Sequence, residues 1–375
     1  MMNADIQIKS DCATAVDIGQ LCELAVRGLV PMFDAERQLF CFRLKRTRHG
    51  MIREGLSHRY TLMALLGLQR SESAGLASSI EIEPVLEQLL RGTSWLTNLG
   101  DLGLLLWLCA LASPARLEEV YSNFNVQGAL SRYREVRERR TMELAWFLSG
   151  LAHAASVQGQ KLPGLSDLAV KTYRLLKENQ GARGPFGHLY QKGTLAGVLR
   201  GHIGSFADQV YPIYALAKFA RVFQIRAALT PAQECADAIR RAQGVLGQWW
   251  WHYNSRTGRV LQRYPVYSVH QHGMAPMALF ALSEATQMEF SEPIYKGLRW
   301  VAGDNELAGD LRVVTPGLVW RSMYHDGAHR EYFRNGMSFL GFTGNEPDDD
   351  LKIKFECRPY ELGWLLYAFA NRGGR

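Results

Sequence analysis

Six strongly apolar segments recur along the chain, and this repetition limits the folds that the chain can adopt. Each segment begins with polar residues and continues as a helical stretch that is apolar on nearly every side. A helix that is apolar all round must be buried, so we expect six inner helices. Pro212, Pro276 and Pro359 are predicted in first turns, where a missing backbone N–H breaks no hydrogen bond. The segments are SHRYTLMALLGL from Ser57, GDLGLLLWLCAL from Gly100, TMELAWFLSGLA from Thr141, DQVYPIYALAKF from Asp208, QHGMAPMALFAL from Gln271 and RPYELGWLLYAF from Arg358.

Amphipathic stretches lie between the apolar segments and are predicted to be outer helices. Leu168–Glu178, Pro231–Leu246 and Glu292–Val301 mix apolar residues with Lys, Arg and Glu at helical spacing. Outer and inner helices that alternate six times predict one all-α domain over residues 1–375, an (α/α)6 toroid. Residues 1–50 are expected to form outer helices that close the ring. The alternative is an open solenoid, but its repeats are usually more uniform in length than these.

Two of the repeats share a finer pattern. Leu175–Phe186 (LLKENQGARGPF) and Ala242–Tyr253 (AQGVLGQWWWHY) each place a Gln at a helix end, then a Gly turn, then an aromatic residue. They resemble the repeat of squalene cyclases and protein prenyltransferases, and the same six-hairpin arrangement occurs in glycoside hydrolases, sugar epimerases and polysaccharide lyases. The resemblance implies the α/α toroid and leaves the chemistry open, because this fold carries many functions.

The starts of the six inner segments are polar against the apolar trend. If the ring closes, these residues meet at one mouth of the toroid. Charged side chains there must pair with one another or belong to a functional site, because burying an isolated charge is costly. The alternative is that the carboxylates only cap helices or pair with arginines. The residues are His58, Arg59, Asp101, Glu143, Asp208, Gln209, His270, His272, Arg358, Tyr360 and Glu361.

Repeats three apart face each other in a six-fold ring. Facing carboxylates suit glycoside hydrolysis, which needs one acid for the leaving oxygen and a second carboxylate as base or nucleophile. Asp208 or Glu361 is expected to supply an essential carboxylate, with Glu143 as a further candidate. The predicted facing pairs are Glu143 with Glu361, Asp101 with His270 and His272, and His58 with Asp208.

The segment Gln262–Met274 (QRYPVYSVHQHGM) holds the densest group of aromatic and titratable residues. It contains Tyr264, Tyr267, His270 and His272, and it follows three consecutive tryptophans, of which Trp250 is predicted to contact substrate. Aromatic rings can stack on sugars, while Tyr267 and His270 could transfer protons near neutral pH. The alternative is an aromatic loop that packs over the end of the ring.

Charge and cysteine usage restrict the partners. The net charge is +7 and the isoelectric point about 9.1, but charge signs alternate locally, which argues against a nucleic-acid partner. Six converging helix N-termini with Arg59 and Arg358 favour an anionic glycan, with Arg358 as its main contact. The six cysteines form no C-x-x-C motif, and no signal peptide or membrane-length apolar run is found. The sequence therefore predicts a cytoplasmic protein.

Other motifs are weaker. His325, Asp326 and His329 could bind a metal on a helix, but Gly327 argues for a loop, and His270 with His272 is a second weak zinc candidate. The run Asp348–Asp350 resembles the acidic motif of class II terpene cyclases but lacks its D-x-D-D form. The sequence contains no P-loop, G-x-S-x-G or dinucleotide-binding motif, so we expect no cofactor and no metal.

Together these patterns predict a carbohydrate-active enzyme that acts on a glycan or glycoconjugate. Hydrolysis would use Glu143, Asp208 and Glu361, whereas epimerisation or elimination would use Tyr267 and the histidines. Two alternatives stay open: an enzyme similar to terpenoid cyclases with an apolar cavity, and a non-catalytic glycan-binding toroid. The polar starts of the inner helices favour the carbohydrate-active enzyme over the terpenoid-cyclase alternative, whose cavity would be lined mostly by aromatic residues.

Overall fold

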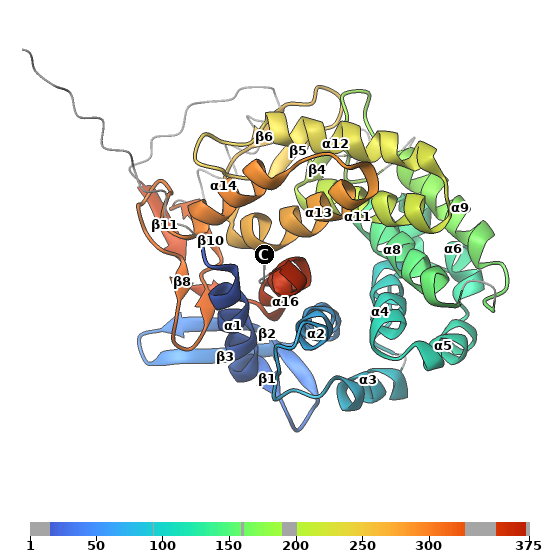
Figure 1. Cartoon of the computed structure of the whole chain (residues 1–375), viewed down its shortest axis with the longest axis horizontal. Coiled ribbons are helices and arrows are strands. Elements are labelled where there is room, and N and C mark those ends of the chain that lie inside the picture. The colour runs from blue at the N-terminus through green and yellow to red at the C-terminus, as the bar shows by residue number, and fades with distance from the viewer. Residues whose placement is uncertain (1–15, 93, 159–160, 190–200, 327–349, 373–375) are drawn as a thin grey trace, which may run out of the picture.

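The computed structural model describes residues 16–92, 94–158, 161–189, 201–326 and 350–372. Six helices form an inner ring (Figure 1). Each packs against the next, and the last packs against the first, so the ring is closed. The predicted inner helices and (α/α)6 toroid are confirmed. The inner helices are α2 (His58–Ser73), α4 (Leu99–Ala112), α8 (Thr141–Gln158), α11 (Ala207–Val222), α13 (Ala275–Thr286) and α16 (Pro359–Phe369).

Further helices surround this ring (Figure 1). The predicted outer helices at residues 168–178, 231–246 and 292–301 are confirmed, with ends shifted by a few residues. Short single-turn helices join the hairpins. The longer outer helices are α1 (Ile18–Leu29), α3 (Ile82–Arg91), α5 (Leu117–Asn123), α9 (Leu165–Lys177), α12 (Leu229–Arg241) and α14 (Ser291–Val301), and the shorter ones are α6 (Ala129–Arg132) and α7 (Arg134–Glu138).

The N-terminal region differs from the prediction. Only α1 is an outer helix there. It is followed by β1 (Phe33–Asp34), β2 (Leu39–Thr47) and β3 (Gly50–Leu56), and β12 (Glu356–Cys357) pairs with β2. Residues 1–15 lie outside the described part of the chain. Among the described residues, the expectation of outer helices is therefore wrong from residue 33 onward, where strands replace them. The segment LFCFRLKRT is rich in residues that pack well on a half-buried pleated surface, and its pairing with β12 comes from the far end of the chain.

Three other small antiparallel sheets lie in the connections. Strands directly precede α2, α11 and α16, and β7 precedes the π-helical turn His270–Met274 that leads into α13. Because these strands end where inner helices begin, the sheets that contain them border the N-terminal mouth of the ring. Their strands are β4 (Ile203–Ser205) with β5 (His252–Asn254) and β6 (Val260–Gln262), β7 (Val266–Tyr267) with β10 (Ser322–His325) and β11 (Leu351–Lys354), and β8 (Arg312–Val313) with β9 (Leu318–Val319).

The Gln-Gly-aromatic repeat has the same geometry in both copies. Gln180 Nε2 donates to the carbonyl oxygens of Gly184 and Pro231, at 2.9 and 2.8 Å. Gln243 Nε2 makes the equivalent bonds to Gly247 and Pro293, at 3.0 and 2.9 Å. Each glutamine thus joins its own turn to the next outer helix. The repeat is therefore a structural device that spaces neighbouring hairpins.

The inner helices run parallel and approach closely through glycines. Gly67 of α2 faces Gly363 of α16, and a Cβ built on Gly67 would lie 2.2 Å from the Gly363 carbonyl oxygen. Of the three prolines predicted in first turns, Pro276 and Pro359 are confirmed. The prediction for Pro212 is wrong, because this residue lies inside α11, which begins five residues earlier.

Aromatic side chains fill the centre of the ring. Trp107 of α4 stacks on Tyr214 with ring centroids 4.7 Å apart and on His153 at 5.0 Å. It also contacts Tyr367 and Trp364 of α16. At this level the described aromatic rings pack on one another. Among the described residues, we find no helix with the length and apolar character needed to span a bilayer.

Candidate active site at the N-terminal mouth

First turns of parallel inner helices bring the predicted polar residues to one end of the ring. Arg59, Asp101, Glu143, Asp208 and Glu361 each lie in or next to such a turn. Unpaired backbone N–H groups at these helix starts carry partial positive charge. The side chains interact mainly with neighbouring helices and loops, and the described contacts include none of the predicted pairings across the ring. The mouth therefore has two separate charged groups.

The first group centres on Glu143 of α8 and Asp208 of α11. Their exposed fractions are 6% and 1%. Glu143 Oε2 and Asp208 Oδ1 have no hydrogen-bond partner among the described residues. Burial raises the pKa of Glu143, and the charge of Asp208 raises it further, while Arg59 and His188 act in the opposite direction. Two buried carboxylates are thus electrostatically coupled, each with one oxygen unengaged.

Asp208 is held by three contacts on its other oxygen. Oδ2 accepts hydrogen bonds from the Ser205 backbone N at 2.9 Å and from the Ser205 hydroxyl at 2.8 Å, and it lies 3.1 Å from His188 Nδ1. These contacts stabilise its negative charge. In the other direction, the charge of Asp208 raises the pKa of His188. The two groups form an ion pair when His188 is protonated.

His188 is a residue that the sequence analysis missed. It lies two positions after Phe186, the aromatic residue of one Gln-Gly-aromatic repeat, in the connection between α9 and α11. Trp251 occupies the corresponding place in the other repeat. Comparing the two repeats position by position would have found a histidine where the second copy has an aromatic ring.

Arg59 and Asp101 form the next part of this group. Arg59 Nε donates to Asp101 Oδ1 at 2.5 Å, and Asn98 Nδ2 donates to the other oxygen. The guanidinium also lies over the Trp146 ring, 5.2 Å from its centroid. Asp101 is thus engaged on both oxygens, unlike Glu143. The predicted His58 stacks on Trp95 with centroids 5.1 Å apart.

The second group encloses Glu361. Its Oε1 is bound by Arg321 Nη1, and its Oε2 accepts a hydrogen bond from the Arg358 backbone N at 3.0 Å. Glu356 pairs with the guanidinium groups of Arg321 and Arg358, at 3.1 and 3.2 Å. Glu361 is fully buried and both of its oxygens are engaged. Its surroundings are those of a structural ion pair, and Arg321 is the partner that sequence reasoning missed.

Arg358 and Tyr360 belong to the same network. Arg358 Nη1 donates to the Tyr60 hydroxyl at 2.9 Å, and its guanidinium lies over Phe42. Arg321 Nη1 reaches the Tyr360 hydroxyl at 3.4 Å. The predicted anion contact, Arg358, is therefore already paired with Glu356.

The remaining predicted residues are mostly packed into the loop above the mouth. Burial lowers the pKa of His270 and of His272 to about 3, so both rings are neutral. Tyr267 lies under the Arg321 guanidinium, and burial raises its pKa. Trp250 Nε1 donates to the Ala242 carbonyl, so this ring packs on α12. Gln209 uses its amide to hold the backbone of Phe186 and Ser205.

The weak metal motifs find no support in the part of the chain that is described, where no group of three or more ligand-type side chains is suitably placed. Asp326 pairs with Lys352, and His325 packs against Tyr264. His329, Asp348 and Asp349 lie outside the described residues.

Comparison with known proteins gives the fold. No protein-family model matches the sequence, and no curated protein matches it. Similar solved structures do exist. One, described as a possible family 105 glycoside hydrolase from Klebsiella pneumoniae, has a TM-score of 0.61 at 11% identity and covers 100% of this chain and 95% of that one.

Two further structures have TM-scores of 0.60. A variant of unsaturated glucuronyl hydrolase from Streptococcus agalactiae is 11% identical and covers 94% of this chain and 90% of that one. A family 76 glycoside hydrolase from a bovine Bacteroides thetaiotaomicron strain is 10% identical, and the match covers 96% of this chain and 78% of that one. The chain therefore has the α/α toroid fold that these glycoside hydrolases share.

Proposed function

We propose that the chain is a glycan-hydrolysing enzyme whose active site is the N-terminal mouth. The observation that carries this proposal is the Glu143–Asp208 pair, two buried carboxylates with one unengaged oxygen each. Buried polar atoms are rarely left without partners, so these oxygens are suited to a substrate. Similar toroids named as glycoside hydrolases support the substrate class.

The two carboxylates have different surroundings and hence different roles. Burial and the neighbouring charge of Asp208 raise the pKa of Glu143, which favours its protonated form. Asp208 is stabilised as an anion by Ser205 and His188. Glu143 is therefore the general acid for the leaving oxygen, and Asp208 is the second carboxylate.

Carboxamide substitutions test this assignment. Glu143→Gln and Asp208→Asn should each lower kcat by about 10²–10⁴-fold, because each removes a proton-transferring or charge-stabilising group. The measurement is sugar release from unsaturated glucuronyl disaccharides and from neutral disaccharides. Glu23→Gln on α1 and Asp237→Asn on α12 are matched surface controls and should keep parental rates.

Glu361→Gln separates catalysis from structure. Because Glu361 pairs with Arg321, its loss should lower the thermal unfolding midpoint, whereas Glu143→Gln should leave the midpoint close to that of the parent. Parental turnover by both Glu143→Gln and Asp208→Asn would contradict the residue assignment. A folded parent that releases no sugar from any acidic or neutral glycan would contradict the function.

A further inference from the structure

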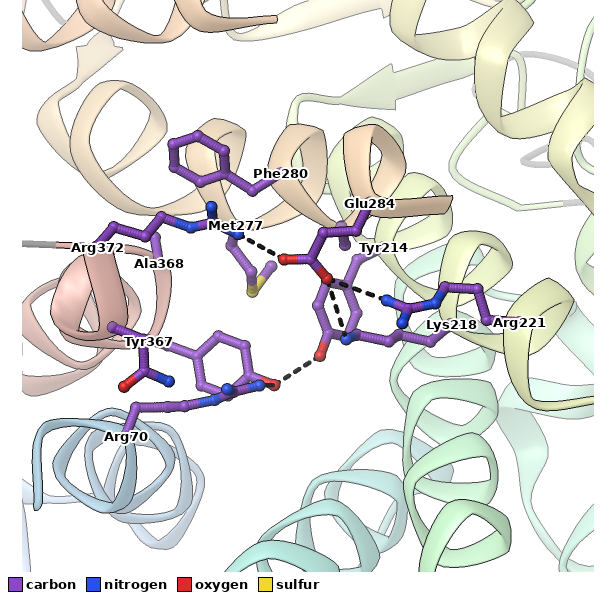
Figure 2. A pocket seen from close by; sticks show the side chains of 12 residues that line it. Arg70, Tyr214, Lys218, Arg221, Met277, Phe280, Glu284, Tyr367, Ala368 and Arg372 are labelled. Carbon is purple, nitrogen blue, oxygen red and sulfur yellow. Dashed lines mark hydrogen bonds and ion pairs between the residues drawn. The ribbon is translucent and has the colours of Figure 1, made fainter. Parts of the chain in front are cut away.

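A cavity of about 530 Å³ lies at the end of the toroid opposite the candidate active site. It is bounded by residues of α2, α11, α13 and α16 and by residues that follow α16 (Figure 2). The volume is within the range of roughly 300–1,000 Å³ that is usual for small-molecule sites. Met277 and Phe280 supply apolar walls, while the other side chains drawn in Figure 2 are mostly cationic or hydroxyl-bearing.

The hydroxyl groups at the base of this cavity are already committed to one another. Trp107 Nε1 and Arg70 Nη2 each lie 3.2 Å from the Tyr367 hydroxyl oxygen, and both nitrogens can only donate. The Tyr367 proton must then point to the Tyr214 hydroxyl oxygen, 2.6 Å away, and the Tyr214 proton to His153 Nε2 at 2.8 Å. Burial lowers the pKa of His153 well below its usual value, so this nitrogen is an acceptor.

The charged groups that line the cavity are mostly cationic. Four basic side chains, those of Arg70, Lys218, Arg221 and Arg372, line it together with one carboxylate, Glu284. Glu284 is shared by three of them: Arg221 at 3.1 Å, Lys218 at 4.0 Å, and Arg372 (Figure 2). One carboxylate cannot neutralise four cations, so the cavity keeps an excess of positive charge.

Lys218 is the side chain that most needs a further partner. Its side chain is 19% exposed, and burial lowers its pKa. Within the described part of the chain, the contacts of Nζ are the 4.0 Å ion pair with Glu284 and the Tyr214 ring face at 5.7 Å. Neither supplies a hydrogen bond, so its three N–H groups have no described acceptor. Arg70 Nε is likewise buried without a partner.

Helix dipoles account for only part of this arrangement. Cations near helix C-termini interact favourably with the terminal carbonyls, and exposed arginines can serve that purpose. Lys218 differs from such exposed arginines, because it is half-buried and loses part of its hydration, and no described acceptor replaces that hydration. A second hollow of about 260 Å³ also borders Lys218 and Arg221 and adds His153 and Ser156. Lys218 thus borders both spaces.

We infer that this cavity binds a small organic oxyanion, a phosphate or carboxylate group carried on a sugar-sized body. Lys218 and Arg70 contact the oxyanion, Arg221 and Arg372 complete its positive surroundings, and Met277 and Phe280 contact the body of the ligand. A charged donor matched to an anionic acceptor gives a strong hydrogen bond and offsets the burial of the lysine. The site is distinct from the mouth and is independent of the hydrolytic function proposed above.

Calorimetric titration of the full chain at low ionic strength tests the inference. Glucose 6-phosphate and glucuronate represent the phosphate and carboxylate sources, glucose is the neutral analogue, and inorganic phosphate is the bare anion. We expect the two acidic sugars to bind at least tenfold more tightly than glucose. Inorganic phosphate should compete with them, and salt should weaken the binding.

Variants locate the binding. Lys218→Gln should lower the affinity for the acidic sugars at least tenfold, whereas Lys218→Arg should retain most of it. Arg91→Gln, at an exposed side chain of α3, should bind the acidic sugars as the parent does. Glu143→Gln should also bind them unchanged, which separates this site from the mouth. Equal binding of glucose and glucose 6-phosphate, or equal affinity in Lys218→Gln and Arg91→Gln, would overturn the inference. So would the absence of binding by every acidic probe.

Discussion

Glu143 and Glu361 show how surroundings decide the chemistry of identical side chains. Both are buried glutamates in the first turn of an inner helix. Arg321 lies against Glu361, so both of its oxygens are engaged and its charge is balanced. Glu143 has Asp208 as its neighbour and keeps one oxygen without a described partner. Glu361 is therefore suited to holding the loop above the mouth, and Glu143 is suited to proton transfer.

The His188–Asp208 pair predicts a pH-dependent stability. Asp208 raises the folded-state pKa of His188 above the unfolded value of about 6.5. The stabilisation is therefore complete below that value and disappears as the pH rises through the folded-state pKa. His188→Gln should lower the thermal unfolding midpoint more at pH 5.5 than at pH 9. His49→Gln, in an exposed turn, should show the same small change at both; an equal loss at both pH values for His188→Gln would contradict the pairing.

His188 also affects the proposed acid. Its positive charge lowers the pKa of Glu143, so removing it should raise that pKa. Because the general acid must be protonated, activity falls as the pH rises through its pKa. The alkaline limb of the kcat/KM profile should therefore move to higher pH in His188→Gln. A limb that stays in place or moves to lower pH would argue against Glu143 as the acid.

At the scale of elements, helix packing is set by where small residues meet. Gly67 and Gly363 let α2 and α16 approach backbone to backbone, and Gly103 and Gly150 do the same for α4 and α8. These contacts set how closely neighbouring inner helices pack around the ring. The polar first turns can then meet at one mouth, which links packing between helices to the geometry of the site.

Alanine substitution tests the contact between α2 and α16. A Cβ at residue 67 would lie 2.2 Å from the Gly363 carbonyl oxygen, so Gly67→Ala must push the two helices apart. We expect a loss of about 1–3 kcal/mol in the free energy of unfolding, measured by urea denaturation. Gly92→Ala, where a Cβ meets no atom within 4 Å, should be nearly neutral. Equal effects of the two substitutions would show that the helices do not rely on this approach.

At the scale of the whole molecule, the ring is closed by segments from the two ends of the chain. α16 packs on α1, α2 and α13 (Figure 1). Trp364 and Tyr367 of α16 contact Trp107 at the aromatic centre. β12 likewise joins β2, and Arg43 pairs with Glu356 across 313 positions. The fold therefore depends on contacts that form only when the chain is complete to α16.

Removing α16 should accordingly abolish cooperative unfolding. A chain that ends at Arg358 leaves α2, α13 and Trp107 without their buried partners, and an exposed apolar surface of that size favours aggregation. A chain that ends at Arg372 retains these contacts and should unfold at nearly the parental temperature. Circular dichroism during heating is the measurement; a sharp transition in the shorter chain would show that the ring does not need closure.

The sequence by itself determined the six inner helices, the toroid and the set of polar residues at its mouth. Such features follow from local periodicity, since a helix that is apolar all round has to be buried wherever it lies. Tertiary structure decided which of those residues stay available. Arg321 binds Glu361 from 40 positions away and Arg43 binds Glu356 from 313. Glu143 and Asp208, by contrast, influence each other electrostatically, and each keeps an oxygen without a described partner. The pairing of charges depends on distances between remote segments, and no local pattern records those distances.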